Sequence, residues 1–213
     1  MPTAKLVSIT PNYVELLKCA CSKPYGRNVS MKTINDHIIA AGHLSVLEHC
    51  YASFEVECSV AVLGQLTRHR HLSFTCQSAR GCEFDEMVVP AFIFEEIKRR
   101  YDKDVTEAEK EKIRKEAAQE LLAPYKEALA EGFPQQDARY FLPQGIKTKI
   151  VVTGNFRAWY EYLPKRLCKR AMPEHRELAE AILEELKKAA PEIFDRNFMN
   201  CGVSCKEKGC AFK

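Results

Sequence analysis

A strict alternation of apolar and polar residues in Ser53–Ser59 sets the strongest limit on the fold. It places Phe54, Val56 and Cys58 on one face of an expected strand. A second stretch, Lys147–Thr153, is rich in β-branched residues and predicts another strand. Most of the remaining apolar residues recur at helical spacing instead. We therefore expect an α+β protein with a single domain.

Several segments around these strands have helical patterns. The segment Met31–Ala41 is expected to form a helix with Ser30 as its N-cap. The charge-rich segment Asp104–Glu131 begins with a capping box in Thr106–Glu109. Pro124 is expected to kink or break this element, because proline removes a backbone donor. Three further helices are expected at about Val60–Arg70, Asn155–Leu167 and Glu174–Ala190.

Composition narrows the class of protein. The 213 residues are 46% hydrophobic and 29% charged, a balance that excludes a disordered or collagen-like chain. No apolar run approaches the roughly 18 residues that cross a bilayer, so no membrane association is expected. The N-terminal residues lack the apolar core of a secretory signal, which favours a cytoplasmic location. A net charge of +3 is too weak to require a nucleic-acid partner.

Ten cysteines are many for a chain of this length. In a reducing compartment they favour burial, metal binding or redox chemistry over disulfides. Cys58 lies in the first expected strand and Cys50 close before it, so both are expected in the core. The C-terminal tail has a C-x3-C-x4-C pattern without the tight pairs of most zinc or iron–sulfur sites, so free mobile thiols are favoured over a metal site. The tail cysteines are Cys201, Cys205 and Cys210, with Cys19 and Cys21 as candidate additions.

The segment Gln65–Arg80 has the most unusual composition, with arginines and histidines crowded beside hydroxyl side chains. Clustered guanidinium groups repel one another, and a phosphate matches their fork geometry. The alternative is a solvated basic surface. The interleaved Leu72, Phe74 and Cys76 argue against a segment that faces only solvent. Anion binding is therefore the favoured interpretation.

A second polar cluster follows the second expected strand, in Asn155–Arg166. Arg157 and Glu161 stand four residues apart and can pair across an exposed helix face. Arg139 is expected at the edge of a loop. His43 follows the first expected helix, where a histidine is more often a core or cap residue than a ligand. The chain has no nucleophile elbow, Walker loop or dinucleotide-binding glycine motif.

One ordered set of motifs links these polar segments. Its centre is the pattern R-H-R-x-x-S followed by S-x-R, from Arg68 to Arg80. Over about His43–Pro191 the chain resembles the flavin-dependent thymidylate synthases, the ThyX family. The flanking blocks match in the same order: Gly42-His43 to Glu48-His49, Gln65, Ala138-Arg139 to Leu142-Pro143, Asn155-x-Arg157, and Arg166.

The resemblance implies a fold and an activity. The expected fold is a small, mostly antiparallel sheet packed with long helices, in a homotetramer whose subunits share each active site. The expected domain covers residues 1–195, and residues 196–213 form a cysteine-rich tail. The implied reaction is reductive methylation of dUMP to dTMP. Methylenetetrahydrofolate would supply the carbon, NADPH the reducing equivalents, and FAD would be the cofactor.

The resemblance also implies a role for individual residues. Arg166 is the implied catalytic residue, because an arginine beside the uracil ring stabilises developing negative charge. His43 is expected near the flavin and the folate, and no metal ligand is implied. FAD is expected to contact Ser45, Arg68, His69, Arg70, Asn155, Arg157 and Glu161. The expected contacts of dUMP are Gln65, Arg68, Cys76, Ser78, Ala79, Arg80, Arg139 and Arg166.

Several positions depart from the family pattern. Thr75 and Cys76 stand at the usual Asn-Glu pair, and Gly81 replaces a usual tyrosine. Glu161 brings a carboxylate to the flavin side, where we expect it to pair with Arg157 or to have a raised pKa. An alternative is therefore a ThyX-like flavoenzyme that acts on a different pyrimidine nucleotide or transfers a different one-carbon unit. Outside this family, the chain would be a nucleic-acid-binding module or a metal or redox sensor that uses the tail cysteines.

Overall fold

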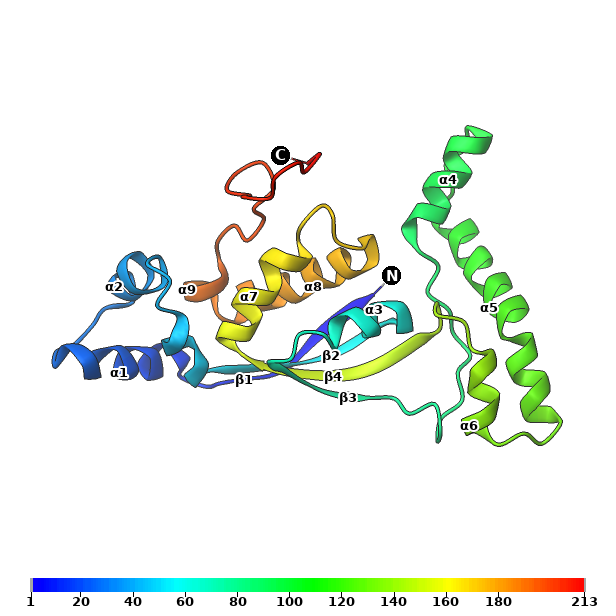
Figure 1. Cartoon of the computed structure of the whole chain (residues 1–213), viewed down its shortest axis with the longest axis horizontal. Coiled ribbons are helices and arrows are strands. Elements are labelled where there is room, and N and C mark those ends of the chain that lie inside the picture. The colour runs from blue at the N-terminus through cyan, green and yellow to red at the C-terminus, as the bar shows by residue number, and fades with distance from the viewer. Residues whose placement is uncertain (1, 213) are drawn as a thin grey trace.

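The computed structural model describes residues 2–212 and has a four-stranded sheet at its centre (Figure 1). The strands are β1 (Thr3–Ile9), β2 (Tyr51–Ser59), β3 (Leu72–Cys76) and β4 (Lys147–Asn155). Their order in the sheet is β1-β2-β4-β3, and each pair of neighbours is antiparallel. The α+β fold with a small antiparallel sheet is confirmed, as are the two strands predicted from the sequence.

Helices cover one face of the sheet and form a separate arm. In Figure 1, α7 and α8 lie over the sheet, whereas α4, α5 and α6 form the arm beyond one end of it. Between residues 2 and 212, no helix is both long enough and apolar enough to cross a bilayer. The elements are α1 (Tyr13–Tyr25), α2 (Met31–Thr33), the π-helix η1 (Ile34–Ile39), the 3-10 helix η2 (Leu44–His49), α3 (Val60–Leu66), α4 (Ala91–Tyr101), α5 (Glu107–Ala130), α6 (Gln135–Ala138), the 3-10 helix η3 (Arg139–Phe141), α7 (Phe156–Arg166), α8 (Pro173–Ala189) and α9 (Pro191–Phe194).

The main core lies between the sheet and the helices that cover it. Phe54 and Cys58 on β2 are fully buried, as is Cys50 just before the strand, which confirms the burial predicted for both cysteines. Trp159 of α7 meets Phe54 edge to face, with ring centroids 5.1 Å apart. Its indole Nε1–H donates to the Ala52 carbonyl at 3.1 Å. The alternation seen in the sequence therefore fixes which face of β2 receives α7.

Gly154 near the end of β4 allows a close approach of β3 and α7. A Cβ at this position would collide with Leu72 Cδ2 and would lie 3.3 Å from Trp159 Nε1. Gly154 pairs with Leu72 across the β3–β4 ladder, so an added Cβ would force the buried Leu72 side chain to repack and would press on the Trp159 indole. A residue without a side chain is therefore required for this packing.

We expect Gly154→Ala to lower the free energy of unfolding by about 1–3 kcal/mol, the usual cost of overpacking a core. Gly64→Ala in α3 is the matched control, since a Cβ there meets no atom within 4 Å. In a helix, alanine is more favourable than glycine by about 0.5–1 kcal/mol, so the control should be stabilised. Urea unfolding of both variants measures the two effects. Equal changes in the free energy of unfolding of the two variants would contradict the packing argument.

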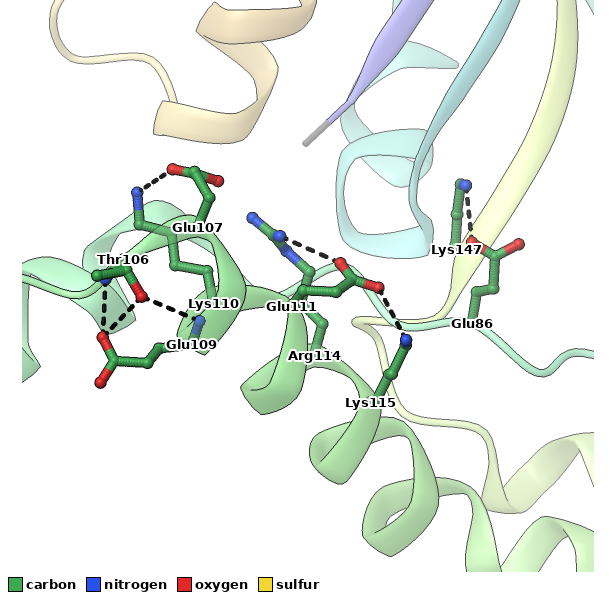
Figure 2. A network of polar contacts seen from close by, with 9 residues as sticks. All are labelled: Glu86, Thr106, Glu107, Glu109, Lys110, Glu111, Arg114, Lys115 and Lys147. Carbon is green, nitrogen blue, oxygen red and sulfur yellow. Dashed lines mark hydrogen bonds and ion pairs between the residues drawn. The ribbon is translucent and has the colours of Figure 1, made fainter.

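The arm has its own small core and a well-defined helix start. The capping box predicted for Thr106–Glu109 is present: Glu109 N–H donates to Thr106 Oγ1 at 3.3 Å, and Thr106 N–H donates to Glu109 Oε2 at 2.9 Å (Figure 2). Pro124, expected to kink or break the helix, lies inside the single helix α5, so the predicted break is wrong. The proline leaves the carbonyl of the solvent-exposed Glu120 without its usual partner, and buried Tyr125 anchors the following turn.

Two other boundaries differ from the expectation. The helix predicted for Val60–Arg70 ends at Leu66, and the residues after the arginine and histidine block form β3. The polar side chains of this block made the short alternation in Leu72–Cys76 hard to recognise in the sequence. This segment forms a strand because it pairs with β4. The helix predicted for Met31–Ala41 begins at Met31 with the Ser30 cap, as expected, but continues as the π-helix η1 to Ile39.

Candidate functional site

The last residue of α7, Arg166, is held by one expected dUMP contact, Gln65, and one expected FAD contact, His69. Its Nε–H donates to His69 Nε2 at 2.8 Å. Its Nη1 and Nη2 donate to the Gln65 side-chain Oε1 and backbone carbonyl, each at 3.2 Å. Because Arg166 occupies the Nε2 lone pair, the proton of a neutral His69 lies on Nδ1. The structure thus fixes the guanidinium in one orientation.

A cavity of about 360 Å³ lies beside Arg166. Within residues 2–212, Arg68, Arg70 and Arg166 form no ion pair with a carboxylate, so the positive charge of this wall is not neutralised. An unneutralised cluster of guanidinium groups is suited to a polyanionic ligand. The cavity is lined by Arg68, His69, Arg70, His71, Ala158, Glu161, Tyr162, Lys165 and Arg166.

A second cavity of about 230 Å³ adjoins the first and shares His71, Ala158 and Glu161 with it. Arg157 lies in its wall between two carboxylates. Its Nη1 lies 2.6 Å from Glu48 Oε1, and its Nε lies 2.8 Å from Glu161 Oε1. The pairing predicted for Arg157 and Glu161 is confirmed. All three side chains are partly exposed, so these pairs are weak and an anionic ligand can displace a carboxylate.

Asn155 directly precedes α7, the helix that carries Arg157 and Arg166. Its Oδ1 accepts a hydrogen bond from the Ala158 backbone N–H at 2.8 Å, so it is the N-cap of α7. The residue also lines the second cavity. Its side-chain NH2 group is not used by the cap and remains a donor for a ligand. Asn155 therefore combines a structural task with the predicted flavin contact.

Other predicted nucleotide contacts lie in a different place. Ser78 and Arg80 line an open cavity of about 480 Å³ together with residues of the α6 region, and this cavity shares no residue with the one beside Arg166. Arg139 is exposed at the start of η3, directly after α6. A single chain therefore does not gather Gln65, Ser78 and Arg166 around one cavity.

The remaining predicted site residues lie outside these three cavities. His43 and Ser45 are exposed at the start of η2. Cys76 is exposed at the end of β3. Ala79 is half-buried, packed against a small cluster that includes Phe84. The structure of one chain brings none of these four residues to the Arg166 cavity.

Two buried polar residues beneath the cavity were not predicted. Tyr162 and His175 are fully buried, and neither the tyrosine hydroxyl nor the two imidazole nitrogens of His175 has a hydrogen-bond partner in the described part of the chain. The rings of His69 and Tyr162 meet edge to face with centroids 4.9 Å apart. A signal for His175 exists in the sequence, because its spacing to Leu178 and Ile182 places it on the buried face of α8.

Both histidines are held neutral by this environment. Burial, reinforced by the nearby Arg166 charge, lowers the pKa of His69 from 6.5 to about 4. The same two causes lower the pKa of His175 to about 3. A histidine unpaired in the unfolded chain keeps an ordinary pKa, so the unfolded chain binds more protons between these values.

We therefore expect the contribution of these two histidines to the free energy of unfolding to be fully present above pH 6.5. It should fall as the pH drops toward 4. Each histidine contributes a slope of about 1.4 kcal/mol per pH unit below its ordinary pKa. Urea midpoints at pH 8.0, 6.5 and 5.0 measure the loss. His175→Leu should flatten the slope, whereas His71→Leu, which replaces an exposed histidine, should leave it unchanged. A slope that does not depend on His175 would contradict this assignment.

The described part of the chain has no cluster of metal-ligating side chains. Among residues 2–212, no three histidine, cysteine or carboxylate side chains are grouped closely enough to hold a metal ion. The cysteine-rich tail is folded back instead. Cys201 is only 8% exposed and lies against Cys168.

The chain is similar to known proteins along most of its length. The family model described as thymidylate synthase complementing protein matches residues 5–192. The chain is 43% identical over 154 residues to the flavin-dependent thymidylate synthase of Pyrococcus furiosus, in a match that covers 71% of this chain and 60% of that protein. It is 36% identical over 214 residues to the enzyme of that name from Sulfurisphaera tokodaii, covering 92% of this chain and 78% of the relative.

A third relative, the flavin-dependent thymidylate synthase of Mycobacteroides abscessus, is 34% identical over 195 residues, with 86% of this chain and 78% of the relative covered. The match to the Pyrococcus protein spans less than two thirds of its length. The resemblance noted in the motifs is thus confirmed by similarity along most of the chain. The chain belongs to the thymidylate synthase complementing protein family, in which these relatives are named flavin-dependent thymidylate synthases.

Proposed function

We propose that this protein is a cytoplasmic, FAD-dependent thymidylate synthase that converts dUMP to dTMP. Methylenetetrahydrofolate supplies the one-carbon unit, and NADPH supplies the reducing equivalents. The observation that carries the proposal is the fixed guanidinium of Arg166. It is held by Gln65 and His69 at the wall of a cavity whose arginines have no carboxylate partner among the described residues.

Arg166 has the geometry for acting on a pyrimidine ring. A guanidinium has five N–H donors, and the bonds to Gln65 and His69 use only part of them. The free donors of the two terminal nitrogens can meet a carbonyl oxygen of the ring. Neighbouring His69 is neutral at physiological pH because burial lowers its pKa to about 4. Arg166 can therefore stabilise negative charge that develops on the ring.

Arg68 and Arg70 fit the pyrophosphate of FAD. Both line the cavity beside Arg166, and their charges lack a counter-ion within residues 2–212. Lys165 adds a further positive charge to the same wall. The flavin, when bound, supplies the hydride chemistry, and the protein supplies position and charge. Arg157 extends the anion-binding surface once a ligand phosphate displaces Glu48 or Glu161.

We further propose a homotetramer in which subunits share each active site. Ser78 and Arg80, the expected contacts of the dUMP phosphate, line a cavity that one chain keeps apart from Arg166. That cavity is open, which is consistent with completion by another subunit. Large aromatic residues such as Tyr101 on the arm and Tyr140 beside Arg139 are 72% and 82% exposed. Exposed aromatic side chains favour protein interfaces.

The direct test uses the purified chain of 213 residues. We expect absorption bands at roughly 370 and 450 nm from an oxidised flavin, and formation of dTMP when dUMP, methylenetetrahydrofolate and NADPH are supplied together. Arg70→Ala should release the flavin more readily, while Arg99→Ala, which replaces a surface arginine paired with Glu96, should retain it. A chain that neither binds FAD nor forms dTMP would overturn the proposal.

A second candidate is a related flavoenzyme for another pyrimidine nucleotide. It is favoured by Cys76, an exposed thiol at the end of β3 where the family signature has a carboxylate. The same assay with dCMP in place of dUMP distinguishes the two functions. Cys76→Glu restores the family residue, so it should preserve or raise turnover of dUMP in an ordinary thymidylate synthase. Activity of the original chain on dCMP instead of dUMP, suppressed by Cys76→Glu, would favour the second candidate.

A further inference from the structure

Two cysteines from distant parts of the chain meet beside the end of α7. The Sγ atoms of Cys168 and Cys201 lie 3.9 Å apart, although the residues are 33 positions apart in sequence. Cys168 is half-buried in the segment between α7 and α8, and Cys201 belongs to the C-terminal tail. Figure 1 shows the tail on the same side of the sheet as α7 and α8. The contact therefore joins the tail to the segment that connects these helices.

The surroundings of Cys201 favour its thiolate. The Lys169 backbone N–H donates to Cys201 Sγ at 3.4 Å. This hydrogen bond, the contact with the Cys168 thiol and the Lys169 charge together lower the pKa of Cys201. The core cysteines have the opposite environment, because burial raises the pKa of Cys50 to about 11 and that of Cys58 to about 12. The thiolate is the reactive form of cysteine.

A second contact holds the tail in this position. Arg170 Nη1 lies 2.8 Å from Glu207 Oε1, so an ion pair lies close to the thiol contact on both segments. No third metal-ligating side chain joins the two cysteines in the described part of the chain. Two adjoining thiols without a third ligand favour disulfide chemistry over metal binding.

We propose that Cys168 and Cys201 form a redox-active dithiol, which a peroxide converts to a disulfide that fastens the C-terminal tail to the segment after α7. The distance between the sulfur atoms must shorten from 3.9 Å to about 2.05 Å, the length of a disulfide bond. Both cysteines lie in irregular segments outside the helices and strands, where a small backbone movement is feasible. This proposal does not depend on the enzymatic function.

The oxidation proceeds in two balanced steps. The Cys201 thiolate attacks one oxygen of hydrogen peroxide and breaks the O–O bond, which gives a sulfenic acid and hydroxide. The Cys168 thiolate then attacks the Cys201 sulfur, forms the S–S bond and expels the second hydroxide. The two thiol protons convert both hydroxides to water. Two thiols are oxidised by two electrons, and one peroxide is reduced to two waters.

Peptide mapping of the intact chain tests the proposal. The protein is treated with hydrogen peroxide, remaining thiols are alkylated, and trypsin releases Cys168 in the peptide 167–169 and Cys201 in the peptide 197–206. We expect these peptides to be linked through Cys201, as fragmentation distinguishes it from Cys205. The product should be at least about tenfold more abundant than any other linked pair, since adjoining thiols have a high effective molarity. Dithiothreitol should reverse it.

Two variants separate this pair from general thiol oxidation. In Cys168→Ser, the sulfenic acid of Cys201 has no resolving thiol and should be trapped by dimedone. In Cys19→Ser, which removes an exposed cysteine elsewhere, the linked product should form as in the original chain. If a variant folds poorly, the peptide mapping of the original chain still decides the outcome. A dominant link between Cys201 and Cys205, or oxidation confined to exposed cysteines, would overturn the proposal.

Discussion

Arg166→Lys is expected to lower the turnover of dUMP about 100-fold, the effect of removing one donor from a site that stabilises developing charge. Lysine keeps the positive charge but loses the planar fork that donates to His69 and Gln65. The ammonium group would therefore still attract the nucleotide without being oriented against its ring. We expect the dissociation constant of dUMP to rise by less than about tenfold, since exchange of one cation for another costs little Coulomb energy.

Steady-state turnover and equilibrium binding of dUMP measure the two quantities separately. Arg170→Lys is the matched control, because Arg170 is an exposed arginine just beyond α7 whose partner is Glu207. It should change neither quantity. If Arg166→Lys weakened binding by the same factor as turnover, Arg166 would act only in holding the bound nucleotide, and its proposed role toward the ring would be wrong.

Glu174→Ala is expected to lower the free energy of unfolding more than any other single substitution of a charged residue. Glu174 is only 4% exposed, at the start of α8. Its Oε1 accepts from the Ser59 backbone N–H and its Oε2 from the Ser59 hydroxyl, each at 2.7 Å. Each hydrogen bond to a charged group contributes about 1.5–3 kcal/mol, so the variant should lose about 3 kcal/mol or more. Because Ser59 is the N-cap of α3, the helix that carries Gln65 should loosen as well.

Urea unfolding followed by circular dichroism gives the free energies. Glu180→Ala replaces an exposed carboxylate on the same helix, and its stability should stay within about 0.5 kcal/mol of the original chain. Glu174→Gln keeps an acceptor and the side-chain volume, so an intermediate loss is expected. Equal stability of the Glu174 and Glu180 alanine variants would show that the buried bonds to Ser59 contribute nothing.

The sequence predicted those elements whose pattern reports burial directly. The strand around Phe54 alternates because one of its faces is covered by helices, and the sequence expresses that difference residue by residue. β1 was missed because a bulge between Leu6 and Ser8 interrupts its register, and Val7 is 60% exposed. β3 was missed because Arg70 and His71 precede it, and its pairing with β4 is a tertiary property.

The site was predicted from motifs rather than from geometry. The spacing of Arg68 and Arg80 carries the family resemblance, but no local pattern shows that Gln65 and Arg166, 101 positions apart, share hydrogen bonds. Nor does the sequence show that Ser78 lies beside α6 instead of beside Arg166. The helical spacing places His175 on the buried face of α8, but only the packed structure shows that its imidazole nitrogens have no hydrogen-bond partner among residues 2–212.

Because α7 begins at the Asn155 cap and ends at Arg166, its length fixes the distance between these two residues of the candidate site. The helix has 11 residues, and at 3.6 residues per turn and about 1.5 Å per residue it returns Arg166 to the face of its own cap about 16 Å away. Inserting or deleting one residue within it would rotate all later side chains by about 100° and carry the guanidinium away from His69 and Gln65. We therefore expect the spacing of Asn155 from Arg166 to matter as much for the proposed site as either residue.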